Sequence, residues 1–487
     1  MRGTFSVLCG IVAYCYAWEG AVFTAELLGA INNFLYGRLL IVLLLGAGLY
    51  FTFRFGFVQL RMLPEAMRVA AEKPSQADAV SSFGALMVST ASRVGTGNIV
   101  GVSTAICMGG SGAVFWMWAI SLIGGATGFA EAVLAQIYKR RDGHGGFFGG
   151  PACYIESVCR SRAPAAAFCL CLILTYGMGF NMLSSYNLQA SFSGYGFYRA
   201  DITPAVIGAA LALTCLFCLS GGEGRIVRIS EALVPLMALA YLCAAFIIVL
   251  RRAYLLPPAL GEIFRRAFDA RAIFSGFSGS CVMYGVRRGL FSNEAGVGSA
   301  PNAAASAHVS HPVKQGLVQT LSVLIDSALC TATALMCLCS GVSPAPGLAG
   351  MPYVQAAAEA SFGAAGPVFI TSATVLFAFT SVVGNFFYID NCLTCILHRR
   401  CPRLLSETAR VLSCALSFTG CIMPMELVWN VADALMGVMC LLNLPALLVL
   451  SGRAAGALDD YIRQRRAGKP PVFDAWEMDA DKMNAQQ

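Results

Sequence analysis

The chain has 487 residues, of which 57% are hydrophobic and only 12% are charged, and its formal net charge is +7. Soluble domains carry roughly 25% charged residues, so the composition excludes an ordinary soluble protein and predicts an all-α membrane protein. The basic residues lie in loops between apolar runs, which favours a role in membrane topology over nucleic-acid binding.

Eleven apolar stretches are predicted to cross the bilayer, which takes about 20 residues in a helix. In chain order they are 38–58, 83–109, 112–137, 164–192, 203–220, 224–250, 271–286, 313–341, 365–390, 404–424 and 427–451. An apolar run at about 4–18 is too short for a span, so residues 1–37 are expected to be extracytoplasmic or interfacial. The polar residues 452–487 are expected to form a cytoplasmic tail.

Lys and Arg are concentrated in one set of loops, with 251–270 as the exception on the opposite side. The loops rich in Lys and Arg are 59–82, 138–163, 221–228, 287–312, 391–403 and the tail. Cytoplasmic loops carry such an excess, so we expect a multi-pass inner-membrane protein with a cytoplasmic C-terminus.

After the first predicted helix (38–58), the remaining ten spans divide into two halves, 83–250 and 271–451. Each half has five spans, so the two halves must run through the membrane in opposite directions. Each half also opens on a glycine-rich span. Interrupted helices at matching positions of two inverted repeats indicate the binding site of a transporter.

The first interruption is predicted around Gly95, Thr96, Gly97 and Asn98. Two glycines two residues apart weaken a helix, and unwound backbone at membrane depth is tolerated only where it lines a cavity or is buried in protein. Its free N–H groups can hold a carboxylate and its free carbonyls a cation. The alternative is close helix packing, because Gly97 and Gly101 form a GxxxG motif.

A second polar, glycine-rich segment at 289–301 follows two arginines and is interpreted as lying at the cytoplasmic side. Arg288, Asn293 and Glu294 are gating candidates there, in a loop held by Arg–Glu contacts. An ordinary capped connection is the alternative.

Isolated polar groups inside predicted spans are the remaining candidates. Thr380 and Ser381 could supply oxygen ligands to a hard monovalent cation, or could bond back to their own helix. Buried ionisable residues are functional candidates by default, although capping or bridging helices is slightly favoured for the two aspartates. They are Arg93, Glu131, Asp326 and Asp433. No nucleotide-binding or hydrolase motif is present, so neither an enzyme nor an organic cofactor is expected.

Taken together, several motifs resemble the alanine or glycine:cation symporter family over about residues 35–452. They are SFGAL (82–86), VGTGNIVGV (94–102), GG (109–110), FWMW (115–118), FAEA (129–132), GGP (149–151), YGVRRGLFSNEAG (284–296), HPVKQG (311–316) and WNVAD (429–433).

The resemblance implies a leucine-transporter-like fold, with one extra N-terminal helix before two inverted five-helix repeats, and sodium-coupled import of alanine or glycine by a monomer in the bilayer. It implies substrate contacts from Gly95, Thr96, Gly97, Asn98, Ser184, Phe277, Ser381 and Asn385. It implies sodium ligands at Ala91, Val94, Phe377, Thr380 and Ser381.

Three residues depart from the family pattern. Ser184 replaces the usual Gln and Asn385 the usual Trp, which implies a larger or more polar substrate than alanine. Arg93 replaces a small residue. Its charge could stand in for sodium, it could bind a substrate carboxylate, or it could pair with a helix carboxylate such as Asp326. A sodium-independent or proton-coupled amino-acid carrier is therefore the alternative hypothesis, and a non-transporting membrane sensor the remote one.

Overall fold

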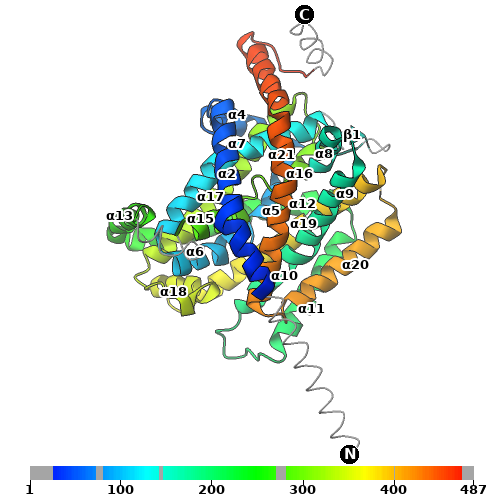
Figure 1. Cartoon of the computed structure of the whole chain (residues 1–487). Helices are drawn as coiled ribbons and strands as arrows, with labels where there is room; N and C mark the ends of the chain where they lie inside the picture. Colours follow the sequence, from blue (N-terminus) through cyan, green and yellow to red (C-terminus); the bar gives the residue numbers. More distant parts are fainter. Residues whose placement is uncertain (1–25, 73–79, 142–145, 270–280, 400, 474–487) are drawn as a thin grey trace, which may run out of the picture.

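The computed structural model describes residues 26–72, 80–141, 146–269, 281–399 and 401–473 of the chain. The described part is a bundle of helices with one two-stranded hairpin, β1 (Arg140–Arg141) and β2 (Phe147–Phe148), between two of them. Seven of its helices are long and apolar enough to cross a membrane, and Gly97–Gly109 and Thr203–Leu219 are shorter apolar helices. The predicted all-α membrane fold is therefore confirmed (Figure 1).

The N-terminal helix, Glu26–Arg54, and the first repeat fill residues 26–251. Their elements are η1 (Leu35–Leu39), α2 (Leu40–Arg54), α3 (Val58–Arg61), α4 (Leu63–Ala70), α5 (Ser82–Arg93), η2 (Gly97–Gly101), α6 (Val102–Gly109), α7 (Gly112–Ile137), α8 (Pro151–Cys159), α9 (Arg162–Leu174), η3 (Thr175–Gly179), α10 (Phe180–Ala190), α11 (Thr203–Leu219) and α12 (Glu223–Arg251).

The connection to the second repeat contains η4 (Ala253–Leu255) and α13 (Leu256–Ala267). The elements of the second repeat are α15 (Cys281–Asn293), α16 (Pro301–Ser306), α17 (Pro312–Leu338), η5 (Pro346–Leu348), α18 (Met351–Phe362), α19 (Ala365–Leu397), α20 (Arg403–Gly420) and α21 (Met425–Arg466).

Corresponding helices of the two repeats pack together at the centre of the bundle. Each repeat opens on a broken helix, α5–η2–α6 in the first and α15–α16 in the second, and the helices that follow the breaks, α7 and α17, pack against each other. The broken helix α5 also packs against α17 and α19. Both breaks are therefore enclosed by long helices, away from the lipid-facing surface.

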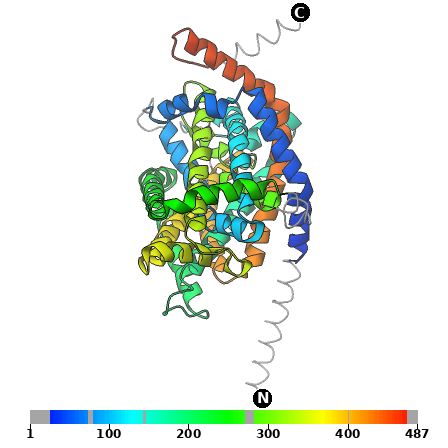
Figure 2. The same cartoon turned by 90° about the vertical axis from the view of Figure 1, so that its left-hand side faces the viewer.

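The N-terminal helix and the last helix lie side by side on the outside of the bundle (Figures 1 and 2). The N-terminal helix begins by Glu26, twelve residues before the expected start at 38. Helix α21 continues to Arg466, whereas the span was predicted to end at 451 and to be followed by a solvated tail. The continuation is amphipathic, since Ala454, Ala457, Leu458 and Tyr461 share its buried face.

The second broken helix also differs from the expectation. The span was predicted to end at 286, but α15 continues as a buried helix to Asn293, and the irregular backbone lies at 294–300, before α16. The glycines at 285 and 289 are packing positions, because a Cβ on either would collide with α7. The polar segment interpreted as a loop outside the span is therefore the break itself.

Candidate functional site

The first break begins where α5 ends, at Arg93. Gly95 N–H, which a continuing helix would direct to the Ala91 carbonyl, instead donates to Asn98 Oδ1 at 2.9 Å. Asn98 N–H donates to the Gly95 carbonyl at 3.2 Å, not to the Val94 carbonyl four residues back. The carbonyls of Ala91 and Val94, both predicted sodium ligands, thereby lose their helical donors.

Asn98 connects this break to the second repeat. Its Nδ2 donates to Asp326 Oδ1 at 2.6 Å and to Ser292 Oγ at 3.1 Å, and Ser292 Oγ lies 2.8 Å from both carboxylate oxygens. Asp326 is fully buried, and no Lys, Arg or His of the described residues forms an ion pair with it. Ser292 was not predicted. Its position next to Asn293, within a polar sequence motif, is the feature from which its role could have been predicted.

The two hydroxyls on α19 behave differently. Ser381 Oγ is buried without a hydrogen-bond partner among the described residues, and a Cβ on Gly95 would collide with it. Thr380 Oγ1 bonds back to the Leu376 carbonyl at 2.9 Å and the Phe377 carbonyl at 3.2 Å. Ser381 therefore faces the first break as an unused oxygen, while Thr380 satisfies its own helix.

The second break is held by buried carboxylates. Glu294, Gly296 and Gly298 all have positive φ. Glu131 Oε1 on α7 accepts from Gly296 N–H at 3.1 Å and from Asn443 Nδ2 at 2.6 Å. Glu294 Oε2 accepts from Ser299 Oγ at 2.5 Å across the break. The Gly296 N–H therefore has an acceptor in place of a helical carbonyl, as unwound backbone in a membrane requires.

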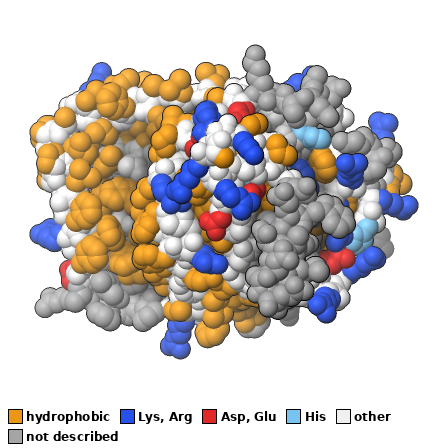
Figure 3. Space-filling model, turned by 90° about the horizontal axis from the view of Figure 1, so that it is seen from above, with side chains coloured by type: hydrophobic (Ala, Val, Ile, Leu, Met, Phe, Trp, Pro, Cys, Tyr) orange, Lys and Arg blue, Asp and Glu red, His pale blue; other side chains and the backbone are white. Residues whose placement is uncertain are grey.

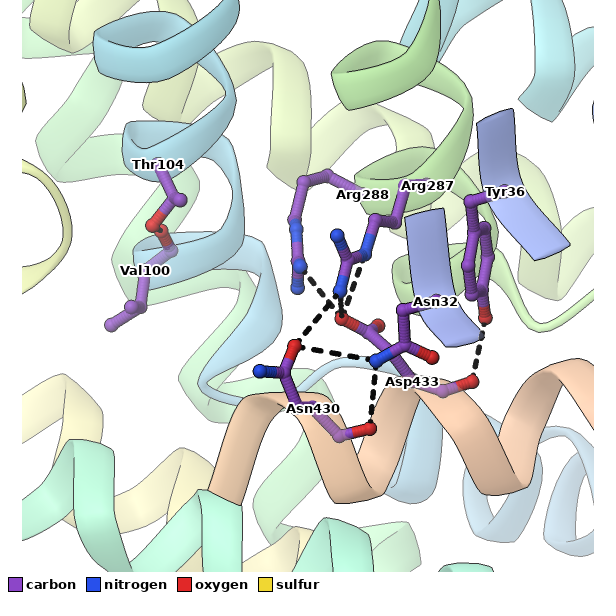
Figure 4. A network of polar contacts seen from close by, with 8 residues as sticks. All are labelled: Asn32, Tyr36, Val100, Thr104, Arg287, Arg288, Asn430 and Asp433. Carbon is purple, nitrogen blue, oxygen red and sulfur yellow. Dashed lines mark hydrogen bonds and ion pairs between the residues drawn. The ribbon is translucent and has the colours of Figure 1, made fainter. Parts of the chain in front are cut away.

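The predicted Arg–Glu gating contact is absent from the described residues. Arg287 and Arg288 both bind Asp433 Oδ2 on α21, with shortest distances of 2.6 Å and 2.8 Å (Figure 4). Asn293 Oδ1 accepts from Ala295 N–H and so caps the end of α15. Position 433 lies near the start of the 42-residue α21, so both arginines lie at the end opposite the C-terminal tail. The expectation that they lie at the cytoplasmic side with the tail is therefore wrong.

The predicted substrate contacts are partly engaged with protein. Asn385 accepts from Ser92 Oγ at 2.6 Å and donates to Asn181 Oδ1 at 2.9 Å. Thr96 Oγ1 accepts from Asn187 Nδ2 at 2.9 Å. Ser184 is buried on α10, the helix that carries both asparagines. Phe277 lies outside the described residues.

An aromatic cluster beside the first break was not predicted. The Phe291 ring packs against Phe180 and Trp429, with centroids 4.7 Å and 5.1 Å apart. A Cβ on Gly97 would lie 2.7 Å from Phe291 Cε1, so Gly97 allows this close approach. Its members come from α10, α15 and α21, which sequence spacing alone could not bring together.

Arg93 is buried on the last turn of α5. Its Nη1 donates to Gln319 Oε1 at 3.3 Å, and its Nε and Nη2 have no partner among the described residues. Pairing with Asp326, one of the three alternatives for Arg93, is not formed among the described residues, and that carboxylate instead accepts from Asn98 and Ser292.

Comparison with known families gives a match to the sodium:alanine symporter family over residues 21–475. The chain belongs to this family. The resemblance noted from the sequence is thus confirmed, and members of the sodium:alanine symporter family are transporters, not enzymes.

Two relatives illustrate the range within the family. The probable sodium/glutamine symporter GlnT of Bacillus subtilis is 42% identical, over 92% of this chain and 93% of GlnT. The sodium/alanine symporter AgcS of Methanococcus maripaludis is 37% identical, over 88% of this chain and 95% of AgcS.

Among solved structures, MhsT in complex with L-phenylalanine is similar with a TM-score of 0.58 at 15% identity, covering 80% of this chain and 93% of MhsT. At that identity the likeness concerns the fold alone, which is leucine-transporter-like.

Proposed function

We propose that this chain is a secondary active transporter that imports a small neutral amino acid by sodium symport through alternating access. The observation that carries the proposal is the first break. The Ala91 and Val94 carbonyls have lost their helical donors there, and the buried Ser381 hydroxyl, which has no partner among the described residues, lies against Gly95 of the same break. Buried oxygens without donors are the ligands that a hard monovalent cation takes.

The substrate would bind at the same break. The half-helix Gly97–Gly109 directs the N-terminal end of its dipole toward the break, where a carboxylate is stabilised. The Phe180, Phe291 and Trp429 cluster lies on the Gly97 side of the break, where Phe291 approaches the backbone. Alanine, named in AgcS, and glutamine, named in GlnT, are therefore the substrates to test first.

The Asn385–Asn181–Ser92 network favours a substrate with polar character on that side of the site. In place of a large aromatic ring, position 385 offers an amide that already exchanges hydrogen bonds with α5 and α10. An amide side chain such as that of glutamine could replace these contacts, whereas alanine could not.

A second candidate, proton coupling, is favoured by Asp326. A fully buried carboxylate without a cationic partner is costly to ionise, so it either binds a cation or carries a proton. Arg93 as a substitute for sodium is less well supported, because its guanidinium bonds Gln319 on α17 and not the oxygens on α19.

The proposed location is the inner membrane with the C-terminus in the cytoplasm. Figure 3 views the end of the bundle where α21 terminates, and Lys and Arg side chains gather there. They include Arg68 and Arg465, which both pair with Glu65. This concentration supports a cytoplasmic face, even though Arg287 and Arg288 no longer contribute to it.

The test is uptake by purified protein in liposomes. Radiolabelled alanine, glycine and glutamine are supplied with an inward sodium gradient, with an equal potassium gradient and with a proton gradient alone. Sodium-driven accumulation of one of them is expected. Accumulation driven by protons alone would replace sodium symport with the second candidate, and no accumulation of any amino acid would refute the substrate class.

A further inference from the structure

A buried cluster of like charges lies outward of the first break, at the contact of α15 with α21. Arg287 and Arg288 are 8% and 4% exposed, and both bind the same oxygen of the fully buried Asp433. No other acidic residue in the described chain forms an ion pair with either of them. The cluster therefore holds two positive charges against one negative charge, away from water.

The hydrogen bonds place the excess positive charge on the Arg288 side of the cluster. Arg287 donates to Asp433 through Nε at 2.8 Å and lies over the Tyr36 ring. Arg288 reaches Asp433 through Nη2 alone, and its buried Nε and Nη1 have no partner among the described residues. The indole Nε1 of Trp429 is a third buried donor that the described part of the chain leaves without an acceptor.

These three donors belong to neighbouring groups. The Arg288 guanidinium lies over the Trp429 ring, 4.1 Å from its centroid. Both side chains approach Gly101 of η2, where a Cβ would be 3.9 Å from Arg288 Cδ and 4.0 Å from Trp429 Cη2. Figure 4 shows Arg288 between Arg287 and the helix that carries Val100 and Thr104. The donors therefore gather between η2, α15 and α21, on the side of Arg288 that faces the first repeat.

We infer that this place is a binding site for a small monovalent anion, either a halide or the carboxylate group of an amino acid. Buried N–H groups of a guanidinium are costly to leave without acceptors, and one negative charge would balance the cluster. Guanidinium and indole N–H groups are donors only, so they select an anion and exclude a cation.

A halide and an amino acid differ in which other buried polar atoms of the cluster they could bind. Asp433 Oδ1 and Asn32 Oδ1 are buried acceptors without donors in the same cluster. A halide would leave both unsatisfied. An amino acid entering from outside could place its carboxylate on Arg288 and its ammonium group on Asp433 Oδ1. A bound anion would also hold α15 against α21.

The experiment measures thermal unfolding of the purified full chain in detergent, at constant sodium concentration and ionic strength. Methanesulfonate is replaced stepwise by bromide or by acetate. The inference predicts a melting temperature that rises and saturates with at least one of the two anions. Saturation with bromide identifies a halide site, and saturation with acetate alone identifies a carboxylate site.

Three variants separate the site from a general salt effect. Trp429→Phe keeps the ring and removes one donor, so its half-saturating anion concentration should rise about tenfold, the effect of one lost hydrogen bond to a charged group. Arg288→Gln should abolish saturation. Trp118→Phe is the matched control, because its indole N–H is already bonded to Thr331 Oγ1, and it should titrate like wild type.

Should Arg288→Gln fail to fold, Trp429→Phe and the anomalous scattering of bromide in crystals still decide the question. An anomalous bromide peak beside Arg288 supports the site. Identical titrations of wild type, Trp429→Phe and Trp118→Phe, or no response to either anion, would overturn it. These measurements need no transport, so they stand apart from the proposed symport.

Discussion

Asn98 and Asp326 are joined by a 2.6 Å hydrogen bond that links the first broken helix to α17. The same asparagine holds Gly95 N–H through its side-chain oxygen, so one residue both ends the first helical segment and anchors it to the second repeat. A change at position 98 should therefore affect the break and the buried carboxylate together.

Asn98→Ala is expected to lower stability by about 1.5–3 kcal/mol, the cost of a hydrogen bond lost from a charged group, and to abolish uptake. Thermal unfolding and liposome uptake measure the two effects. Thr104→Ala is a suitable control, since that hydroxyl bonds only the Val100 carbonyl of its own helix. An Asn98→Ala protein with wild-type melting and uptake would show that the bond has no such role.

The close approach of Gly95 to Ser381 gives a second prediction. Gly95→Ala should cost about 1–3 kcal/mol of stability and stop transport, because the new Cβ collides with Ser381 Oγ. Adding Ser381→Ala removes the collision and should restore the melting temperature.

The single variant Ser381→Ala tests the ion site. It removes a buried hydroxyl that has no partner, so stability should stay the same or rise, while the sodium concentration needed for half-maximal uptake should increase about tenfold or more. Thr380→Ala is the comparison, because Thr380 already bonds its own helix. Sodium dependence that survives unchanged in Ser381→Ala would remove this residue from the ion site.

Much of this site could be predicted from residue patterns, and the misses have physical causes. Gly95 and Gly97 marked the first break because a helix interior disfavours glycine. The second break was predicted too close to the N-terminus, because the glycines at 285 and 289 suggest unwinding although they serve close packing. The break itself, at 294–300, is polar because buried carboxylates bind there.

The residue pattern could not predict contacts between side chains that are far apart in the sequence. Hydropathy indicated that Asp433 is buried, but not that two arginines 145 and 146 residues away bind it. The Phe291 cluster and the Gln319 contact of Arg93 likewise depend on how helices of opposite repeats meet. Family resemblance supplied expectations for single positions. Three-dimensional packing decides which of those side chains already hydrogen-bond to protein and which are left to bind an ion or a substrate.

A fourth prediction concerns pH and His311, which caps α17 outside the membrane span. Its Nδ1 accepts from Val313 N–H at 3.2 Å, and its Nε2 lies 3.2 Å from Asp460 Oδ2. Burial lowers the pKa of His311 from 6.5, and Asp460 opposes the shift only in part. The unfolded chain therefore binds a proton at higher pH than the folded one.

Stability from this group is fully present above pH 6.5 and is lost as the pH falls below that value, because protonation of Nδ1 removes the cap. His311→Asn keeps an N-cap acceptor but does not titrate. Its melting temperature should fall less than that of wild type between pH 7 and pH 5. Parallel pH curves for the two proteins would contradict the assignment.

The last prediction separates the interpretations of Arg93. If its guanidinium stood in for sodium, Arg93→Thr would create sodium-dependent uptake in a protein that lacked it. The contact of Nη1 with Gln319 on α17 supports a different outcome: wild type already responds to sodium, and Arg93→Thr retains that response with a similar half-saturating concentration. Loss of the donor to Gln319 should lower stability by about 1–3 kcal/mol.

Arg93→Gln isolates the charge from the hydrogen bond, because glutamine can still donate to Gln319. Arg93→Gln should therefore keep a sodium response like that of wild type and lose less stability than Arg93→Thr. Sodium dependence that appears only in the two variants would instead establish Arg93 as the replacement for the ion.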